Sequence, residues 1–117
     1  MQRGEVRLID LEPARGGEAN KRRPAIIVSN DRANATADRL RRGVVTVVPV
    51  TSNTTHVFPF QVLLRATATD LRADSKAQAE QVRSVTVERV GPVLGRVPPQ
   101  LMAEVDQALR LHLQLSL

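Results

Sequence analysis

The stretch NKRRPAIIVSN, residues 20–30, joins a basic loop to a continuous apolar run. The run over residues 25–29 is typical of a central strand that is buried on both faces of a sheet. Pro24 fixes φ at the start of this strand and pushes Arg23 toward an extended conformation, where loop becomes strand. A planar cation held on such a scaffold suits a phosphate or a phosphoryl transition state. The simpler interpretation is that the two arginines are solvated loop charge.

The other apolar segments extend this strand into a small sheet. Strands are predicted over residues 5–11, 25–29, 44–50, 60–64, 81–87 and 91–97. Pro and Gly-Gly mark residues 12–20 as a loop, and Pro49 indicates an edge or bulge. Capping residues at 29–34 predict a short helical turn, and residues 66–74 are turn-like. Because no helix separates successive strands, an antiparallel sheet is favoured over a parallel one.

The C-terminal segment predicts an amphipathic helix. Pro98 and Pro99 lie where a helix can begin. Residues that can share one helix face recur after them at three- and four-residue spacing: Leu101, Val105, Ala108, Leu109 and His112. The predicted fold is therefore mainly β with α, a single domain over residues 1–117. We expect an SH3-like partial barrel of bent antiparallel strands plus this helix.

The amino-acid composition limits the classes of function that the chain can have. The chain has 17 Lys and Arg against 12 Asp and Glu, a net charge of +5, with Lys only at positions 21 and 76. Such an Arg surplus favours bidentate phosphate contacts, or equally reflects a genome that prefers Arg codons. Aromatic residues make up 2%, so Phe58 and Phe60 are the only rings of the usual stacking type. Zero Cys excludes disulfides, thiolate metal sites and Cys nucleophiles.

Several site classes and locations are disfavoured. His56 and His112 are isolated in sequence, so no metal site and no cofactor is expected; we expect His56 exposed in a loop and His112 packed on its helix. No phosphate-binding glycine motif occurs. Residues 1–5 lack an apolar targeting region, and no apolar run approaches bilayer length. These features predict a soluble, cytoplasmic protein with no membrane partner.

Two polar loops, residues 16–23 and 51–56, could converge at one end of the sheet. Together they offer six candidate side chains: Glu18, Arg23, Thr51, Ser52, Asn53 and His56. This set suits RNA cleavage by internal attack of a 2′-OH, which needs a proton acceptor, charge stabilisation and a proton donor, without metal or cofactor. Without further information, Thr51 is better explained as an ordinary residue at a strand end.

Five segments resemble the MazF/PemK (Kid) toxins in order and spacing: RGEV at 3–6, DLEP at 10–13, GGE at 16–18, RPAIIVSN at 23–30 and EQVRS at 80–84. The resemblance covers essentially the whole chain. It implies a ribosome-independent endoribonuclease of a type II toxin–antitoxin pair that cuts single-stranded RNA at short motifs. Such toxins leave a 2′,3′-cyclic phosphate and a 5′-OH. They form homodimers and are silenced by a MazE-like antitoxin whose C-terminal segment covers the RNA site.

The same resemblance assigns roles to residues. The family's catalytic Arg before Pro falls on Arg23, its catalytic Thr on Thr51 and its loop acid on Glu18. Arg23 would stabilise the phosphate, because a guanidinium stays protonated and is therefore a poor base. Thr51 would bind a nonbridging oxygen, and Glu18 would accept the 2′-OH proton. Further RNA contacts are expected at Asn20, Lys21, Arg22, Asn30, Ser52, Asn53 and Gln81.

The sequence also departs from the family pattern. Gly4-Glu5-Val6-Arg7 stands where Gly-Asp-Val-(Trp/Tyr) is common, so a ring near the first strand is absent. Two other functions are considered. A CcdB-type gyrase poison would depend on the C-terminal helix end, but residues 113–117 lack a Trp anchor. A noncatalytic basic module would bind RNA with salt dependence and make no new ends. For the toxin, we expect an acidic, disordered antitoxin segment to land on the basic loop 15–23.

Overall fold

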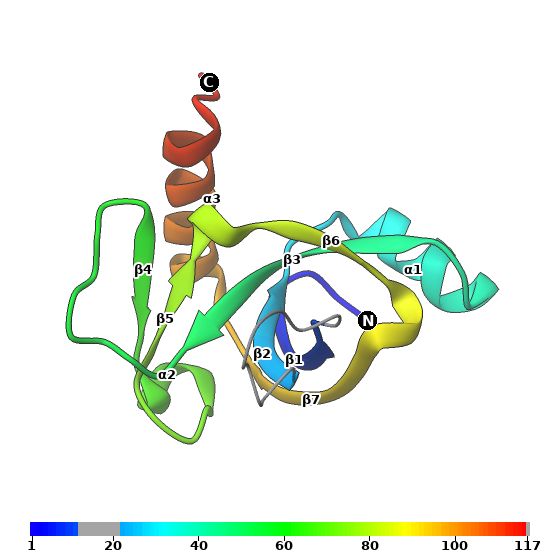
Figure 1. Cartoon of the computed structure of the whole chain (residues 1–117), viewed down its shortest axis with the longest axis horizontal. Coiled ribbons are helices and arrows are strands. Elements are labelled where there is room, and N and C mark those ends of the chain that lie inside the picture. Colours follow the sequence, from blue (N-terminus) through cyan, green and yellow to red (C-terminus); the bar gives the residue numbers. More distant parts are fainter. Residues whose placement is uncertain (12–21, 117) are drawn as a thin grey trace, which may run out of the picture.

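The structure, a computed structural model, describes residues 1–11 and 22–116. Their strands are β1 (Glu5–Asp10), β2 (Arg22–Ile27), β3 (Val44–Thr51), β4 (Gln61–Leu64), β5 (Ser75–Gln78), β6 (Arg83–Thr86) and β7 (Val90–Arg96). The helices are α1 (Asp31–Leu40), α2 (Ala66–Thr69) and α3 (Pro99–Leu113), with 3-10 turns η1 (Ala79–Gln81) and η2 (Val87–Arg89). Figure 1 shows α1 and β4 at opposite ends of the molecule.

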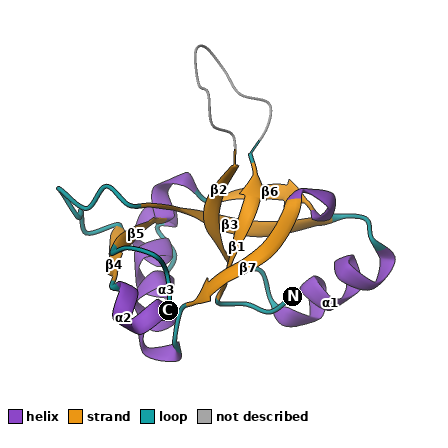
Figure 2. Ribbon diagram, turned by 90° about the horizontal axis from the view of Figure 1, so that it is seen from below, coloured by secondary structure: helices purple, strands orange, loops and turns teal. Residues whose placement is uncertain are grey.

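All strand pairs in these ranges are antiparallel, in the order β4-β5-β3-β2-β1-β7, and β6 also pairs with β3. One edge of β3 is shared between two partners: β6 takes residues 44–47 and β5 takes residues 50–51. The sheet therefore opens around β3 and bends without closing (Figure 2). The predicted mainly β fold with bent antiparallel strands and a C-terminal helix is confirmed.

Two hydrophobic cores lie on the two faces of this sheet. Successive side chains of a strand point to opposite faces, so β2 contributes Ile26 to one core and Ala25 and Ile27 to the other. All three are 0% exposed, as expected for a strand buried on both faces. The first core also contains Val105 and other residues of α3, and the second contains Ala37 of α1. These two cores hold the strand ends that carry the candidate site.

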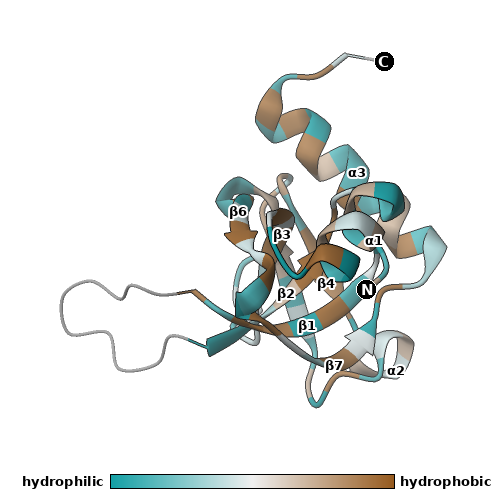
Figure 3. Cartoon of the chain, turned by 90° about the vertical axis from the view of Figure 1, so that its right-hand side faces the viewer, coloured by the Kyte–Doolittle hydropathy of each residue, from teal (hydrophilic) through white to brown (hydrophobic). Residues whose placement is uncertain are grey.

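Helix α3 differs in one respect from the predicted stripe. Val105 and Ala108 are buried and Leu101 and Leu109 partly buried, but His112 is exposed, so its predicted packing is wrong. His112 belongs to the last turn of α3, and the C-terminal turns of this helix extend past the sheet (Figures 1 and 3). Over the described residues, no helix has both the length and the apolar character needed to cross a membrane.

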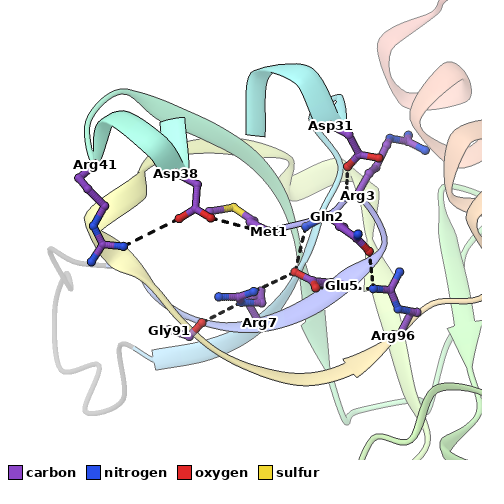
Figure 4. Close-up of polar contacts among 10 residues, drawn as sticks. All are labelled: Met1, Gln2, Arg3, Glu5, Arg7, Asp31, Asp38, Arg41, Gly91 and Arg96. Atoms are coloured by element: carbon purple, nitrogen blue, oxygen red, sulfur yellow. Dashed lines mark hydrogen bonds and ion pairs between the residues drawn. The ribbon is translucent and has the colours of Figure 1, made fainter. Parts of the chain in front are cut away.

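A charged cluster ties the N-terminus to the sheet edge (Figure 4). Arg7 donates from Nη1 to Glu5 Oε1 at 2.8 Å and from Nε to the carbonyl of Gly91 on β7 at 2.8 Å. Glu5 Oε1 also accepts from the backbone N–H of Gln2 at 3.0 Å, and Glu5 Oε2 lies 3.6 Å from Arg96 Nη2. We call Glu5, Arg7 and Arg96 the N-terminal ion cluster. It joins β1 to β7.

The same cluster shifts the titration of its carboxylate. Burial by itself raises the pKa of Glu5, but the hydrogen bonds from Gln2 and Arg7 and the positive charges of Arg7 and the N-terminus outweigh it. The net result is a pKa for Glu5 below its ordinary value. Glu5 is therefore held as a carboxylate in the folded protein.

Candidate functional site

Arg23 is the second residue of β2, and its side chain is exposed. The β1–β2 register sets Arg23 opposite the fully buried Ile9, and Arg22 opposite Asp10. Pro24 follows directly, so Arg23 has the extended backbone that the sequence predicts. Within the described residues, its guanidinium makes no hydrogen bond or ion pair. Its charge is therefore available to an anionic ligand.

Thr51 is the last residue of β3 and is half-buried. On one side it pairs with Lys76 of β5. On the other side, the β2–β3 ladder ends at the pair Ala25 and Pro49, and Arg23 and Thr51 each lie two residues beyond that pair, at the same end of the sheet. The fold thus brings together the two residues that the family resemblance assigns to catalysis, although 28 positions separate them in the sequence.

Arg23 and Thr51 share one face of the sheet, because side chains two residues apart on a strand point the same way and the pair Ala25 and Pro49 lies on that face. Arg23, Thr51 and Lys76 therefore form a row across β2, β3 and β5, which we call the strand-end row. Their chain neighbours Val50 and Ala77 belong to the core under α3. The strand-end row consequently faces away from α3.

The segment after β3 is a tight polar turn. Thr51 Oγ1 accepts a hydrogen bond from the backbone N–H of Asn53 at 3.2 Å, and Asn53 Oδ1 accepts one from Thr55 N–H at 3.2 Å. Because Oγ1 acts as acceptor in this turn, its own proton remains available for a nonbridging phosphate oxygen. Ser52 and Asn53 are exposed beside it. Arg23 and Thr51 together can supply a cation and a hydroxyl donor to one phosphate.

A cavity of about 470 Å³ opens next to these strand ends. Its walls include Pro24, Val50 and Ser52 together with residues 70–73 that follow α2. Pro24 and Val50 point to the face opposite the strand-end row, so the cavity and the row lie on different sides of the sheet. Ser52, at the end of β3, is the residue that links the two.

Of the other predicted RNA contacts, the structure places some away from the strand-end row and one beside it. Asn30 follows the far end of β2, where its Oδ1 caps α1 by accepting from the N–H of Ala33 at 2.8 Å. Gln81 is exposed on η1, between the two strands that share one edge of β3. Arg22 is exposed at the site end of β2, next to Arg23. The remaining predicted site residues lie outside the described residues: Glu18, Asn20 and Lys21.

Sequence reasoning missed Lys76, which the fold places in the strand-end row. Its segment SKAQ has no apolar alternation, so the sequence offered no strand signal there. The available signal was the lysine itself, one of only two in the chain. Over the part of the chain that the structure describes, no three His, Asp or Glu side chains gather as a metal site would require, and His56 and His112 are both exposed.

Known proteins share both the sequence and the fold. A sequence model of the PemK-like, MazF-like toxin of type II toxin–antitoxin systems matches residues 2–113. The chain is 63% identical over 115 residues to Endoribonuclease MazF9 of Mycobacterium tuberculosis, a match that covers 98% of each chain. The crystal structure of MazF from Deinococcus radiodurans is 27% identical with a TM-score of 0.77, covering 98% of this chain and 97% of that one. A MazE–MazF structure from the same organism is 25% identical with a TM-score of 0.73, covering 99% and 97%.

The described residues define a small, mainly β protein: a bent, open antiparallel sheet with a C-terminal helix and, at its strand ends, a threonine and an arginine that bonds to none of these residues. The chain belongs to the PemK-like, MazF-like toxin family of type II toxin–antitoxin systems. The resemblance seen in five sequence segments is thereby confirmed. Family membership favours this class over the gyrase-poisoning alternative.

Proposed function

We propose that this toxin is an endoribonuclease that cuts single-stranded RNA at the strand-end row. The observation that carries the proposal is the guanidinium of Arg23, which bonds to no described residue and lies at the same strand ends as the hydroxyl of Thr51. The M. tuberculosis relative that matches over nearly the whole chain is named an endoribonuclease, which supports the same activity here. A phosphodiester is the group that a planar cation beside a hydroxyl donor would hold.

The reaction is an internal transfer. The ribose 2′-oxygen forms a bond to the neighbouring phosphorus and loses its proton to a base, while the bond to the 5′-oxygen breaks and that oxygen gains a proton. The products are a 2′,3′-cyclic phosphate and a 5′-OH. Arg23 stabilises the charge on the phosphoryl oxygens, because a guanidinium stays protonated and is therefore a poor base. Thr51 donates to a nonbridging oxygen, and Glu18 is the proposed acceptor of the 2′-OH proton.

The proposal includes the partners of the family. A MazE–MazF structure is among the similar folds, which supports a MazE-like antitoxin for this chain. An acidic antitoxin segment would be attracted by the same positive end of β2 that attracts RNA, so the two would compete. We further propose a homodimer that acts in the cytoplasm, where its RNA substrate is.

The test is cleavage of a long single-stranded RNA in EDTA, with mapping of the new ends. We expect cyclic-phosphate and 5′-OH ends at a few short motifs without any divalent ion. Two matched control variants lie on α1, at the other end of the molecule: Arg39→Ala for Arg23→Ala, and Thr36→Ala for Thr51→Ala. Activity that disappears in EDTA and returns with a divalent ion would contradict the mechanism. RNA binding without new ends would instead support the alternative function, a noncatalytic RNA-binding module.

A further inference from the structure

The segment between β3 and β4 holds a cluster of aromatic rings. Phe58 and Phe60 are stacked, with centroids 5.4 Å apart and planes 2° apart. His56 lies 6.1 Å from Phe58 at an angle of 32°. These are the only two phenylalanines in a chain without Trp or Tyr, and both lie within nine residues of Thr51. Phe58 is nevertheless 48% exposed, so one of the chain's two large rings presents much of its surface to solvent.

This exposed ring is fixed in place by buried polar groups. Lys76 is 8% exposed, and its Nζ donates to the backbone carbonyl of His56. The same ammonium lies 5.9 Å from the centroid of the Phe58 ring, within range of a cation–π contact. Gln61, also 8% exposed, accepts from the N–H of Phe58 at 3.2 Å and donates to Glu80 Oε2 at 2.8 Å. The side chains of Lys76, Gln61 and Glu80 thus hold this segment in place, which distinguishes it from a freely solvated loop.

The anchor also sets where the ring lies. Lys76 is the direct β5 partner of Thr51, and its side chain points to the face that carries the strand-end row. Because the ammonium of Lys76 donates to the backbone carbonyl of His56 and lies 5.9 Å from the centroid of the Phe58 ring, this segment and the Phe58 ring lie beside that row. A nucleotide whose phosphate reaches Arg23 and Thr51 therefore has an aromatic surface next to it.

We propose that Phe58, flanked by His56, is a base-stacking subsite for a nucleotide next to the scissile phosphate, and that Lys76 is its positioning residue. An aromatic face stacks on any base, so this subsite supplies affinity and holds the strand, and base choice is made elsewhere. The buried ammonium adds a positive charge beneath the ring, which favours a polyanionic strand. The inference rests on the proposed function, since it places the ring on the path of the RNA.

A nucleic-acid base explains this surface better than a second copy of the chain. The exposed apolar residues here are few, Val57 and Phe58, and the preceding residues 52–55 are all polar. A protein interface needs a larger apolar centre. One ring with adjacent cations and hydroxyls is instead the composition of a single-strand binding site.

The absence of Trp and Tyr makes a direct test available. Phe58→Trp introduces the sole indole, and its fluorescence is followed as a single-stranded 2′-O-methyl RNA, which cannot be cleaved, is added. We expect saturable quenching by stacking. The matched control is Leu40→Trp, since Leu40 is 50% exposed on α1 at the other end of the molecule, and there we expect no saturable change. Equal responses of the two variants, or none at position 58, would overturn the subsite.

Binding and turnover separate this inference from the proposed function. Phe58→Leu is expected to weaken RNA binding on the order of 5- to 150-fold, with the loss in KM and not in kcat, and Phe58→Tyr to restore it. Lys76→Met in the Phe58→Trp protein should shift the indole emission before any RNA is added, and Lys76→Arg should reverse much of that shift. Quenching of the indole by RNA without any cleavage would contradict the proposed nuclease activity but not the subsite. Cleavage without quenching would contradict only the subsite, as would an emission change that depends on protein concentration in the absence of RNA.

Discussion

Two regions that carry arginines on neighbouring strands have opposite surroundings. In the N-terminal ion cluster, Arg7 and Arg96 both reach the carboxylate of Glu5. In the strand-end row, no carboxylate of the described residues contacts Arg23. Arg7 and Arg23 lie on adjacent paired strands, so their difference does not come from the kind of element that carries them.

The contrast separates structural charge from functional charge. A guanidinium that is already paired gains little from a ligand, because binding would first have to break its existing contacts. Arg7 also explains the departure from the family pattern at this position. Instead of an aromatic ring, the chain has a side chain that bridges β1 to the Gly91 carbonyl of β7. The residue thus contributes to the sheet edge.

The largest expected effect comes from removing each of these two arginines in turn and comparing the loss of cleavage with the loss of stability. Arg23→Ala should reduce the rate of RNA cleavage roughly 10³-fold, the upper range for removing one transition-state donor, and leave the free energy of unfolding within about 0.5 kcal/mol. Arg7→Ala should do the reverse. It removes charge-assisted hydrogen bonds from a mostly buried site, so we expect a loss of about 1–3 kcal/mol in stability.

The measurements are single-turnover cleavage of RNA and urea unfolding of each variant. For Arg7→Ala, the rate per folded molecule should equal that of the wild type. If Arg7→Ala lost cleavage while remaining folded, or Arg23→Ala kept most of it, the division between structural and functional arginines would be wrong.

Thr51 tests the neutral half of the strand-end row and has a smaller expected effect. Thr51→Val keeps the shape but removes the hydroxyl, so cleavage should fall roughly 10²-fold, whereas Thr51→Ser should retain most of the rate. Thr36→Val on α1 is the matched control, because the exposed Thr36 hydroxyl donates to the Arg32 carbonyl at 3.1 Å. Equal rates for Thr51→Val and Thr51→Ser would show that the hydroxyl does not take part.

The sequence predicted the central part of this arrangement because its residues obey strong local rules. Pro24 restricts Arg23, and the apolar run 25–27 has no stable position except a buried strand. The placement of Arg23 and Thr51 at the same end of the sheet, by contrast, depends on the register of β2 with β3. No local pattern encodes that register, so from sequence it came only through the family resemblance.

Two elements were predicted poorly for a different reason. Helix α1 has ten residues where a short turn was predicted, because its sequence is largely polar and has little apolar periodicity. Asn34 anchors this helix to the chain before it: Asn34 is fully buried, and its side-chain amide donates to the Ser29 carbonyl at 2.8 Å. No strand was predicted over the residues of β5, because the segment SKAQ has no apolar alternation. Both elements depend on buried polar contacts, which hydrophobic patterns do not report.

The smallest expected effect concerns pH and the N-terminal ion cluster. Because the folded-state pKa of Glu5 lies below its ordinary value, the carboxylate adds stability at neutral pH. That contribution is complete above the unfolded-state pKa of about 4.3 and is lost as pH falls through the lower folded-state value. Glu5→Gln keeps an acceptor but removes the charge. We therefore expect a loss of about 1 kcal/mol or less at pH 7, which disappears on acidification.

Urea unfolding of wild type and Glu5→Gln from pH 7 to pH 3 measures this difference directly. Glu104→Gln, an exposed change on α3, is the matched control and should stay within about 0.5 kcal/mol of the wild type at pH 7. Cleavage by Glu5→Gln should be unchanged, because Glu5 belongs to the paired region. A stability difference that persisted at pH 3 would mean that Glu5 acts through its packing, and the charge pairing that distinguishes this cluster from the strand-end row would then contribute nothing measurable.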